Sequence, residues 1–207
     1  CRDELPKLFK NVSFILISHG HDDHFEPQTV NALKNTDIKW IIPDFLKETA
    51  FSYGMKEENL IVAQKDKKLY IDGIEILPFE GKHFRKSNGA GIESLCYFVT
   101  GKNVPSVLFL GDVRDYEIGN IKVDSEIDYL FSHVWLGDNV AGNDALTGEI
   151  PQMFVDYVTS FSPKNIVLAH LYESGRSKNN MWKLCHATAL SELIKRKCPE
   201  LKVIIPL

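Results

Sequence analysis

The chain has 207 residues, of which 44% are apolar and 25% are charged. These ordinary proportions predict one globular domain over residues 1–207, large enough to bury a core. The formal net charge of −4 argues against a broad basic surface, so a nucleic-acid partner is not favoured. No apolar run is long enough to cross a bilayer, so no membrane partner is expected.

Strands and helices are expected to alternate over the first sixty residues. An apolar run predicts the first strand, and Pro27 suits the first turn of a helix because its missing N–H is not needed there. Pro43 introduces a second helix, which Gly54 closes. The predicted ranges are strand 12–18, helix 27–35, strand 38–42 and helix 43–53.

Short β segments dominate the middle of the chain. The dipeptide Asp72-Gly73 between two apolar runs is a strong hairpin signal, because a two-residue turn needs residues that tolerate positive φ. The strands are predicted at 60–63, 68–71, 74–79, 95–100, 104–110 and 127–132.

Helices return towards the C-terminus, with a helix over 149–161, a strand over 165–169, a helix over 179–196 and a last strand over 202–205. Hairpins followed by alternating strands and helices favour sheets that are covered by helices on their outer faces. The predicted fold class is therefore mixed α/β (α+β). The stretch 85–91 contains Gly and Ser and is predicted to be a mobile loop.

The four cysteines are scattered, and none belongs to a C-x-x-C pair: Cys1, Cys96, Cys185 and Cys198. This pattern favours free thiols over a disulfide framework, so a reducing, cytoplasmic setting is expected. Cys96 lies in an apolar strand and His186 in the last helix, and both are expected to pack in the interior.

The segment His19-Gly20-His21-Asp22-Asp23-His24 follows the first predicted strand and reads H-x-H-x-D-H. Neutral imidazole and ionised carboxylate are the groups that hold zinc and related transition metals. Clustered histidines also occur in solvated loops, or bind metal adventitiously with no role. Four ligand-type residues in this order, after a buried-type strand, favour a metal site.

Three further ligand-type residues stand at or just past the ends of apolar runs. His83 follows the predicted strand over 74–79, and Asp112 follows that over 104–110. His170 follows the strand over 165–169. A lone His is more often a packed or surface residue, but three such cases after H-x-H-x-D-H indicate one assembled site.

The ordered motifs resemble those of the metallo-β-lactamase-fold hydrolases, in which H-x-H-x-D-H is followed by a His, an Asp and a His. The resemblance runs from residue 12 to about residue 172. It implies an αββα sandwich with the site at one edge of two facing sheets. Such proteins have several strands before the first motif, whereas only about eleven residues precede the first strand here. We therefore expect part of the N-terminal sheet to be missing from this sequence.

The resemblance also implies a site for two divalent metal ions: His19, His21 and His83 would hold one, Asp23, His24 and His170 the other, and Asp112 would bridge them. Zinc is expected, and manganese or iron also suits His and Asp ligands. Two such ions can share a hydroxide and stabilise a developing oxyanion. The implied activity is hydrolysis, in which that hydroxide attacks a phosphoester, an ester or a lactone, with Asp23 and Asp112 in catalytic roles.

Two details resemble the branch that contains RNase Z-like phosphodiesterases and sugar-phosphate lactonases. The turn Lys82-His83 stands where lactamase- and glyoxalase-like members have a T-P-G-H type turn. Residues 127–133 resemble A-D-x-L-x-x-E, with His133 at the Glu place. This implies a catalytic His133, because an imidazole can give a proton to a leaving group near neutral pH. The alternative is a strand-end His that faces solvent or is capped by a neighbour.

Basic residues flank the expected ligands: Lys82, Arg85 and Lys86 surround His83, and Arg176 follows His170. They favour a small anionic substrate that carries phosphate or carboxylate, although solvated loop charges would give the same pattern. The shape of the pocket is expected to depend on residues 88–92 and 137–147.

Two other functions stay open. A non-hydrolytic metal-binding sensor or interaction module could use the same fold, although the intact ligand set argues against a degenerate site. A diiron oxygen-reducing centre would usually carry Glu at the place of His21. The sequence identifies neither the substrate nor the oligomeric state.

Overall fold

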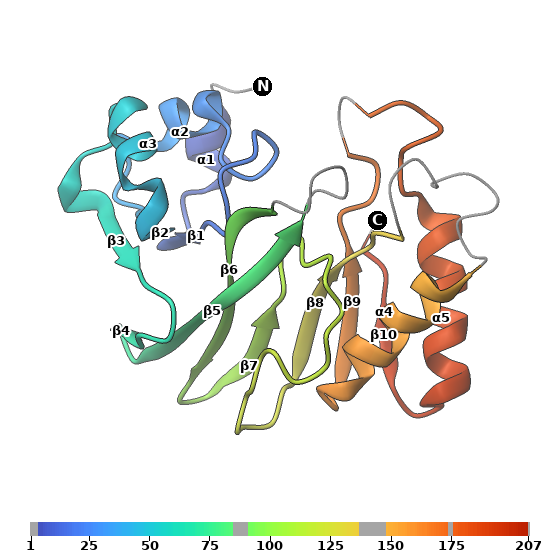
Figure 1. Ribbon diagram of the computed structural model, residues 1–207. Coiled ribbons are helices and arrows are strands. Elements are labelled where there is room, and N and C mark those ends of the chain that lie inside the picture. The colour runs from blue at the N-terminus through green and yellow to red at the C-terminus, as the bar shows by residue number, and fades with distance from the viewer. Residues whose placement is uncertain (1–3, 85–90, 137–147, 174–175, 207) are drawn as a thin grey trace.

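The computed structural model describes residues 4–84, 91–136, 148–173 and 176–206. Within these ranges the strands form two sheets, one of three strands and one of seven. Figure 1 shows helices α1, α2 and α3 beside the smaller sheet and helices α4 and α5 against the larger one. The order of layers is therefore helix, sheet, sheet, helix.

The small sheet consists of parallel strands in the order β1 (Phe14–Leu16), β2 (Lys39–Pro43) and β3 (Leu60–Ala63). Parallel neighbours need crossover connections, and helices supply them here. The helical segments of this half are α1 (Leu5–Leu8), α2 (Pro27–Leu33), η2 (Asp44–Leu46), α3 (Lys47–Ser52) and η3 (Glu57–Asn59).

The large sheet has the strand order β10-β9-β8-β7-β6-β5-β4. Its strands β4 to β7 are antiparallel neighbours, and β7 to β10 are parallel. The bounds are β4 (Leu69–Ile71), β5 (Ile74–Phe84), β6 (Gly91–Gly101), β7 (Val104–Phe109), β8 (Tyr129–His133), α4 (Glu149–Ser160), β9 (Asn165–Ala169), α5 (Leu184–Lys197) and β10 (Lys202–Ile204).

Side-chain alternation along the strands separates the core into layers. In β2, Trp40 and Ile42 pack towards the helices, whereas Ile41 packs towards the large sheet. In β6, Leu95 and Tyr97 belong to the layer between the sheets. Cys96 and Phe98 of the same strand belong to the cluster that α4 and α5 cover. Successive residues of a strand point to opposite faces, so each central strand contributes to two apolar layers.

Most predicted elements are present with shifted ends. Asp72 and Gly73 both have positive φ, 49° and 82°, as a two-residue hairpin turn needs. The strand predicted at 74–79 continues to Phe84, because β5 pairs with β6 along its whole length. The helix predicted over 179–196 begins only at Leu184, because the backbone of Lys183 is extended with φ −127°.

Two predicted segments lie largely outside the residues that the structure describes. The predicted loop at 85–91 and the pocket-shaping stretch 137–147 lie outside the described residues, apart from Gly91 in β6.

Among the described residues, no helix combines the length and apolar character needed to cross a bilayer.

The layer between the sheets is expected to be sensitive to the loss of side-chain volume. Ile41 is fully buried there, so Ile41→Ala should leave a cavity and lower the free energy of unfolding by about 2–5 kcal/mol. Urea denaturation measures the change. The matched control is Val104→Ala on β7, where 44% of the residue is exposed and the loss should stay below about 1 kcal/mol. Equal losses in the two variants would contradict this packing.

Candidate metal centre

The expected ligands come from strand ends of both sheets. The segment 19–24 leaves the small sheet just after β1, whereas Asp112 and His170 follow β7 and β9 of the large sheet. His83 was predicted to follow its strand but lies within β5, opposite Ile92 of β6. The ladder therefore fixes the backbone of His83 more firmly than a loop would.

Hydrogen bonds between the two sheets hold the first motif in place. The Ser18 carbonyl accepts the Leu95 N–H at 2.9 Å, and the Ile17 carbonyl accepts the Tyr97 hydroxyl at 2.7 Å. Gly111, with φ +58°, passes close to Ser18, where a Cβ would lie 3.4 Å from the serine Cβ. These contacts bring the loop after β7 against the loop after β1.

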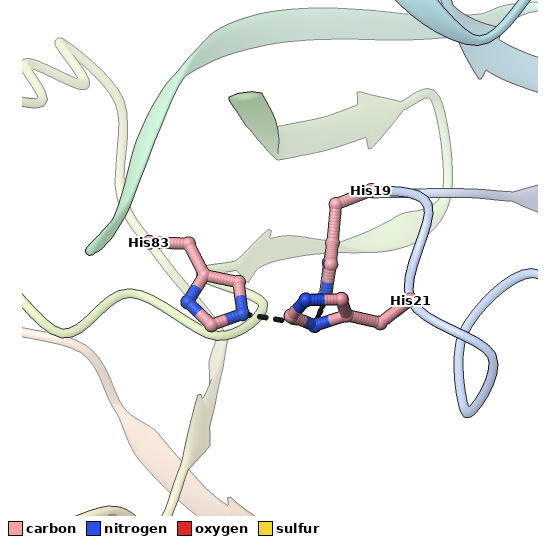
Figure 2. Close-up of side chains that lie close together, drawn as sticks. All are labelled: His19, His21 and His83. Carbon is pink, nitrogen blue, oxygen red and sulfur yellow. Dashed lines mark hydrogen bonds between the residues drawn. The ribbon is translucent and has the colours of Figure 1, made fainter. Parts of the chain in front are cut away.

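Three imidazoles converge on one point (Figure 2). The distance from His21 Nδ1 is 3.1 Å to His19 Nε2 and 3.2 Å to His83 Nε2. Two nitrogens bound tetrahedrally to one zinc ion lie about 3.3 Å apart, given a Zn–N bond of about 2.0–2.1 Å. The spacing thus suits three lone pairs that share one ion.

A second group lies beside the first. His24 Nε2 and His170 Nε2 are 3.1 Å apart, and Asp23 Oδ2 is 3.3 Å from His170 Nε2. The side chains of Asp23 and His24 approach to 3.8 Å. Both groups are compact enough to hold a metal ion, with their ligand atoms all within 4.8 Å of one another.

Asp112 lies between the two groups. Its Oδ2 is 3.3 Å from His24 Nε2 and 3.9 Å from the Nε2 atoms of His19 and His83. The structure therefore brings together the side chains of all seven residues that the sequence suggested as ligands. A carboxylate oxygen that faces nitrogens of both groups is suited to bridge two cations.

The electrostatics of the centre favour neutral imidazoles and ionised carboxylates. Burial, followed by the neighbouring His24, lowers the pKa of His19 to about 3. Burial, followed by Arg114, lowers the pKa of His83 to about 4. Burial alone would raise the pKa of Asp112, but the imidazoles of His133 and His24 hold it well below its usual value. Metal ions require these protonation states, so the residues fit divalent cations.

Two residues that sequence reasoning missed contact ligands from outside. Ser18 Oγ is 2.9 Å from His19 Nδ1, and Glu173 Oε2 is 3.7 Å from His170 Nδ1. Arg176 donates from Nε to Glu173 and holds that carboxylate. Partners of this kind orient ligand imidazoles. A serine directly before a ligand and a glutamate three residues after one are the only sequence signals, and both are weak.

Two of the basic residues that flank the ligands in the sequence pair with acidic neighbours. Lys82 Nζ lies 3.2 Å from Asp115 and 2.7 Å from Glu117, and Arg176 pairs with Glu173. Arg85 and Lys86 lie outside the described residues.

A cavity of about 430 Å³ adjoins the centre. His24, Asp112, His133 and His170 line one part of it, and apolar side chains line the rest, among them Leu16, Tyr97, Phe109 and Phe131. A small molecule in this cavity would therefore lie against the ligands of the second group.

His133 is buried at the end of β8 and does not face solvent, which excludes the surface alternative. Its Nδ1 is 3.6 Å from Asp112 Oδ1, and its ring lies 4.2 Å from that of His170, centroid to centroid. The residue thus joins the centre, next to the expected bridge.

No protein-family model and no curated protein sequence matches this chain. Solved structures do. It is similar to a possible metal-dependent hydrolase from Veillonella parvula, with TM-score 0.68 and 15% identity over 98% of this chain and 76% of that one. An isothiocyanate hydrolase from Delia radicum gut bacteria gives TM-score 0.65 and 18% identity over 98% and 76%. A metallo-β-lactamase fold protein from Bacillus subtilis gives 0.61 and 18% over 98% and 80%.

The chain therefore has the metallo-β-lactamase fold, and the αββα sandwich expected from the motifs is confirmed. The two faces that meet between the sheets carry the apolar layer, and the metal centre lies at the ends of their strands.

We expect the metal-free protein to lose stability as the pH falls from about 7 towards 4. The folded pKa values of His19 and His83, about 3 and about 4, lie below the ordinary value of 6.5. In that window the unfolded chain binds protons that the folded chain does not, so the free energy of unfolding decreases on acidification. His170 acts in the opposite direction, because Asp23 and Asp112 raise its pKa despite burial. Urea unfolding in chelator across this range tests the slope, and a double variant, His19→Gln with His83→Gln, should flatten it. An unchanged slope in that variant would refute the assignment.

Glu173→Gln is expected to weaken zinc binding at the second group by about 10–100-fold, because His170 loses a negatively charged partner at Nδ1. Competition with a chromophoric chelator measures the affinity. Glu192→Gln, which removes an exposed carboxylate from α5, is the matched control and should leave the affinity unchanged. Wild-type affinity in Glu173→Gln would show that the 3.7 Å contact has no role in metal binding.

Proposed function

We propose that this protein is a metal-dependent hydrolase that uses two divalent ions, zinc in the first instance and manganese or iron as alternatives. The observation that carries the proposal is the position of Asp112 Oδ2 between nitrogens of both ligand groups. In this proposal His19, His21 and His83 hold one ion, Asp23, His24 and His170 hold the other, and Asp112 bridges them.

When bound, the ions would supply Lewis acidity, which lowers the pKa of water and stabilises negative charge on a reacting oxygen. The residues of the chain determine how strongly a substrate feels that charge. Three neutral imidazoles leave the charge of the first ion uncompensated, whereas Asp23 offsets part of the charge of the second. Asp112 reduces the repulsion between the two ions. The catalytic roles that we assign to Asp23 and Asp112 rest on this division.

We further propose a small anionic substrate with a phosphoester, ester or lactone bond. Two carboxylates do not neutralise two dications, so the loaded centre keeps a net positive charge that attracts anions. The adjoining cavity of about 430 Å³ is within the size range of small-molecule sites. Lys82 and Arg176 add little to this attraction, because acidic side chains already pair with them.

We place the protein in a reducing, cytoplasmic setting. Support comes from Cys96, Cys185 and Cys198, which are free thiols. Cys96 is buried and donates its S–H to the Leu110 carbonyl, so it contributes to packing as expected.

The proposal is tested by screening the wild-type protein against phosphodiesters and lactones, with and without zinc or manganese. Asp112→Ala should reduce any metal-dependent hydrolysis by about 100-fold or more, because the centre loses its bridging charge. Circular dichroism should report a preserved fold. Asp124→Ala, at an exposed position, is the matched control and should keep full activity.

Full activity in Asp112→Ala would overturn the proposal. Metal-loaded wild-type protein that hydrolyses nothing on the panel would instead favour the non-hydrolytic sensor.

A further inference from the structure

The two carboxylate oxygens of Asp112 have different surroundings. Oδ2 faces the metal-binding nitrogens, at 3.3 Å from His24, 3.8 Å from His170 and 3.9 Å from His19. Oδ1 is buried and has no hydrogen-bond partner within the described part of the chain. The ring nitrogen that approaches Oδ1 is His133 Nδ1, at 3.6 Å. His133 therefore approaches the other oxygen of the carboxylate from the one that lies nearest to these ligand imidazoles.

The backbone of His133 is firmly held. It is the last residue of β8 and pairs with Ala169 of β9, and the next residue, Val134, donates its N–H to the Ala169 carbonyl at 3.1 Å. The ring packs against that of His170, with an angle of 60° between the planes. A side chain anchored in this way can fix the orientation of a neighbour.

The imidazole of His133 places two polar nitrogens in the interior. Both nitrogens of His133 are buried, and neither has a hydrogen-bond partner among the described residues. Buried polar atoms without partners are costly, so an apolar ring would fill the same space at a lower cost. The 3.6 Å separation from Oδ1 is just beyond hydrogen-bond length, and a small rotation of either side chain would close it.

We propose that His133 is a positioning residue, whose neutral ring donates the Nδ1 proton to Asp112 Oδ1. This donation would occupy one oxygen of the carboxylate and turn the other, Oδ2, towards both metal ions. This inference rests on the two-ion centre of the proposed function, but its effect on metal binding does not require that the centre hydrolyses a substrate. The positioning role of His133 differs from the role of a proton donor to the leaving group.

Two substitutions distinguish the hydrogen-bond donor of His133 from the volume of its ring. His133→Phe keeps the aromatic volume and removes the donor. His133→Asn loses volume but keeps a short amide N–H that can occupy the place of Nδ1. The control is His186→Phe, which removes another buried imidazole, one that accepts the Lys183 N–H at the start of α5, away from the centre.

Metal affinity is the first measurement, made by zinc titration against a chromophoric chelator together with the visible spectrum of the cobalt-loaded protein. We expect His133→Phe to weaken binding of the second equivalent by about 10–100-fold and to change the cobalt spectrum. His133→Asn should restore most of the affinity, and His186→Phe should bind as the wild type does. Wild-type affinity in His133→Phe, or loss in His133→Asn alone, would overturn the proposal.

Activity is the second measurement, on whichever ester or phosphodiester the wild type hydrolyses, with an activated and an unactivated leaving group. A positioning residue should slow both substrates by the same factor. A loss confined to the poor leaving group, with normal metal affinity, would assign a proton-donor role and refute positioning. If the wild type hydrolyses neither, the proposed function fails while the titration still decides the role of His133.

Discussion

The centre depends on keeping one ionised carboxylate in a buried place. Asp112 is nearly inaccessible to water, and burial by itself would favour its protonated form. Several imidazoles surround it and reverse that preference, although the pKa values of His19 and His83 show that these rings are themselves kept neutral. His19 and His83 therefore offer partial positive edges to this anion, whereas His170, whose pKa is raised despite burial because Asp23 and Asp112 lie close to it, accepts a proton more readily. A bound metal cation would stabilise this buried anion more strongly than neutral imidazoles do.

The expected metal ligands lie at one edge of the two facing sheets. The apolar layer between them is built around Ile41 and Tyr97, and Tyr97 also lines the cavity beside the centre. Most of the expected ligands follow a strand end, and His83 is the second-last residue of β5, so the polar side chains gather at one edge of the packed layer. Because Tyr97 donates its hydroxyl proton to the Ile17 carbonyl, the same residue links the core to the segment that carries the first motif.

Much of the fold could be predicted because periodicity and turn chemistry are local. The Asp72-Gly73 hairpin and the strands beside it follow from a few adjacent residues. The end of β5 could not be predicted, since Glu80 to Phe84 are held in a strand by pairing with β6, a tertiary effect. The residues proposed as metal ligands could be recognised from the order of the His and Asp motifs along the chain. Ser18 and Glu173 were not, because a contact to the far side of an imidazole leaves no pattern in the sequence.

Each ligand group draws on both halves of the sandwich. His19 and His21 come from the loop after β1 of the small sheet, and the third member of their group, His83, comes from the large sheet. In the second group, Asp23 and His24 come from the loop after β1 of the small sheet, and His170 follows β9 of the large sheet. Each half supplies only part of either ligand group, so both groups are complete only when the halves are docked. An ion at either position would therefore link the two sheets at an edge that the hydrogen bonds from Leu95 to Ser18 and from Tyr97 to Ile17 already join.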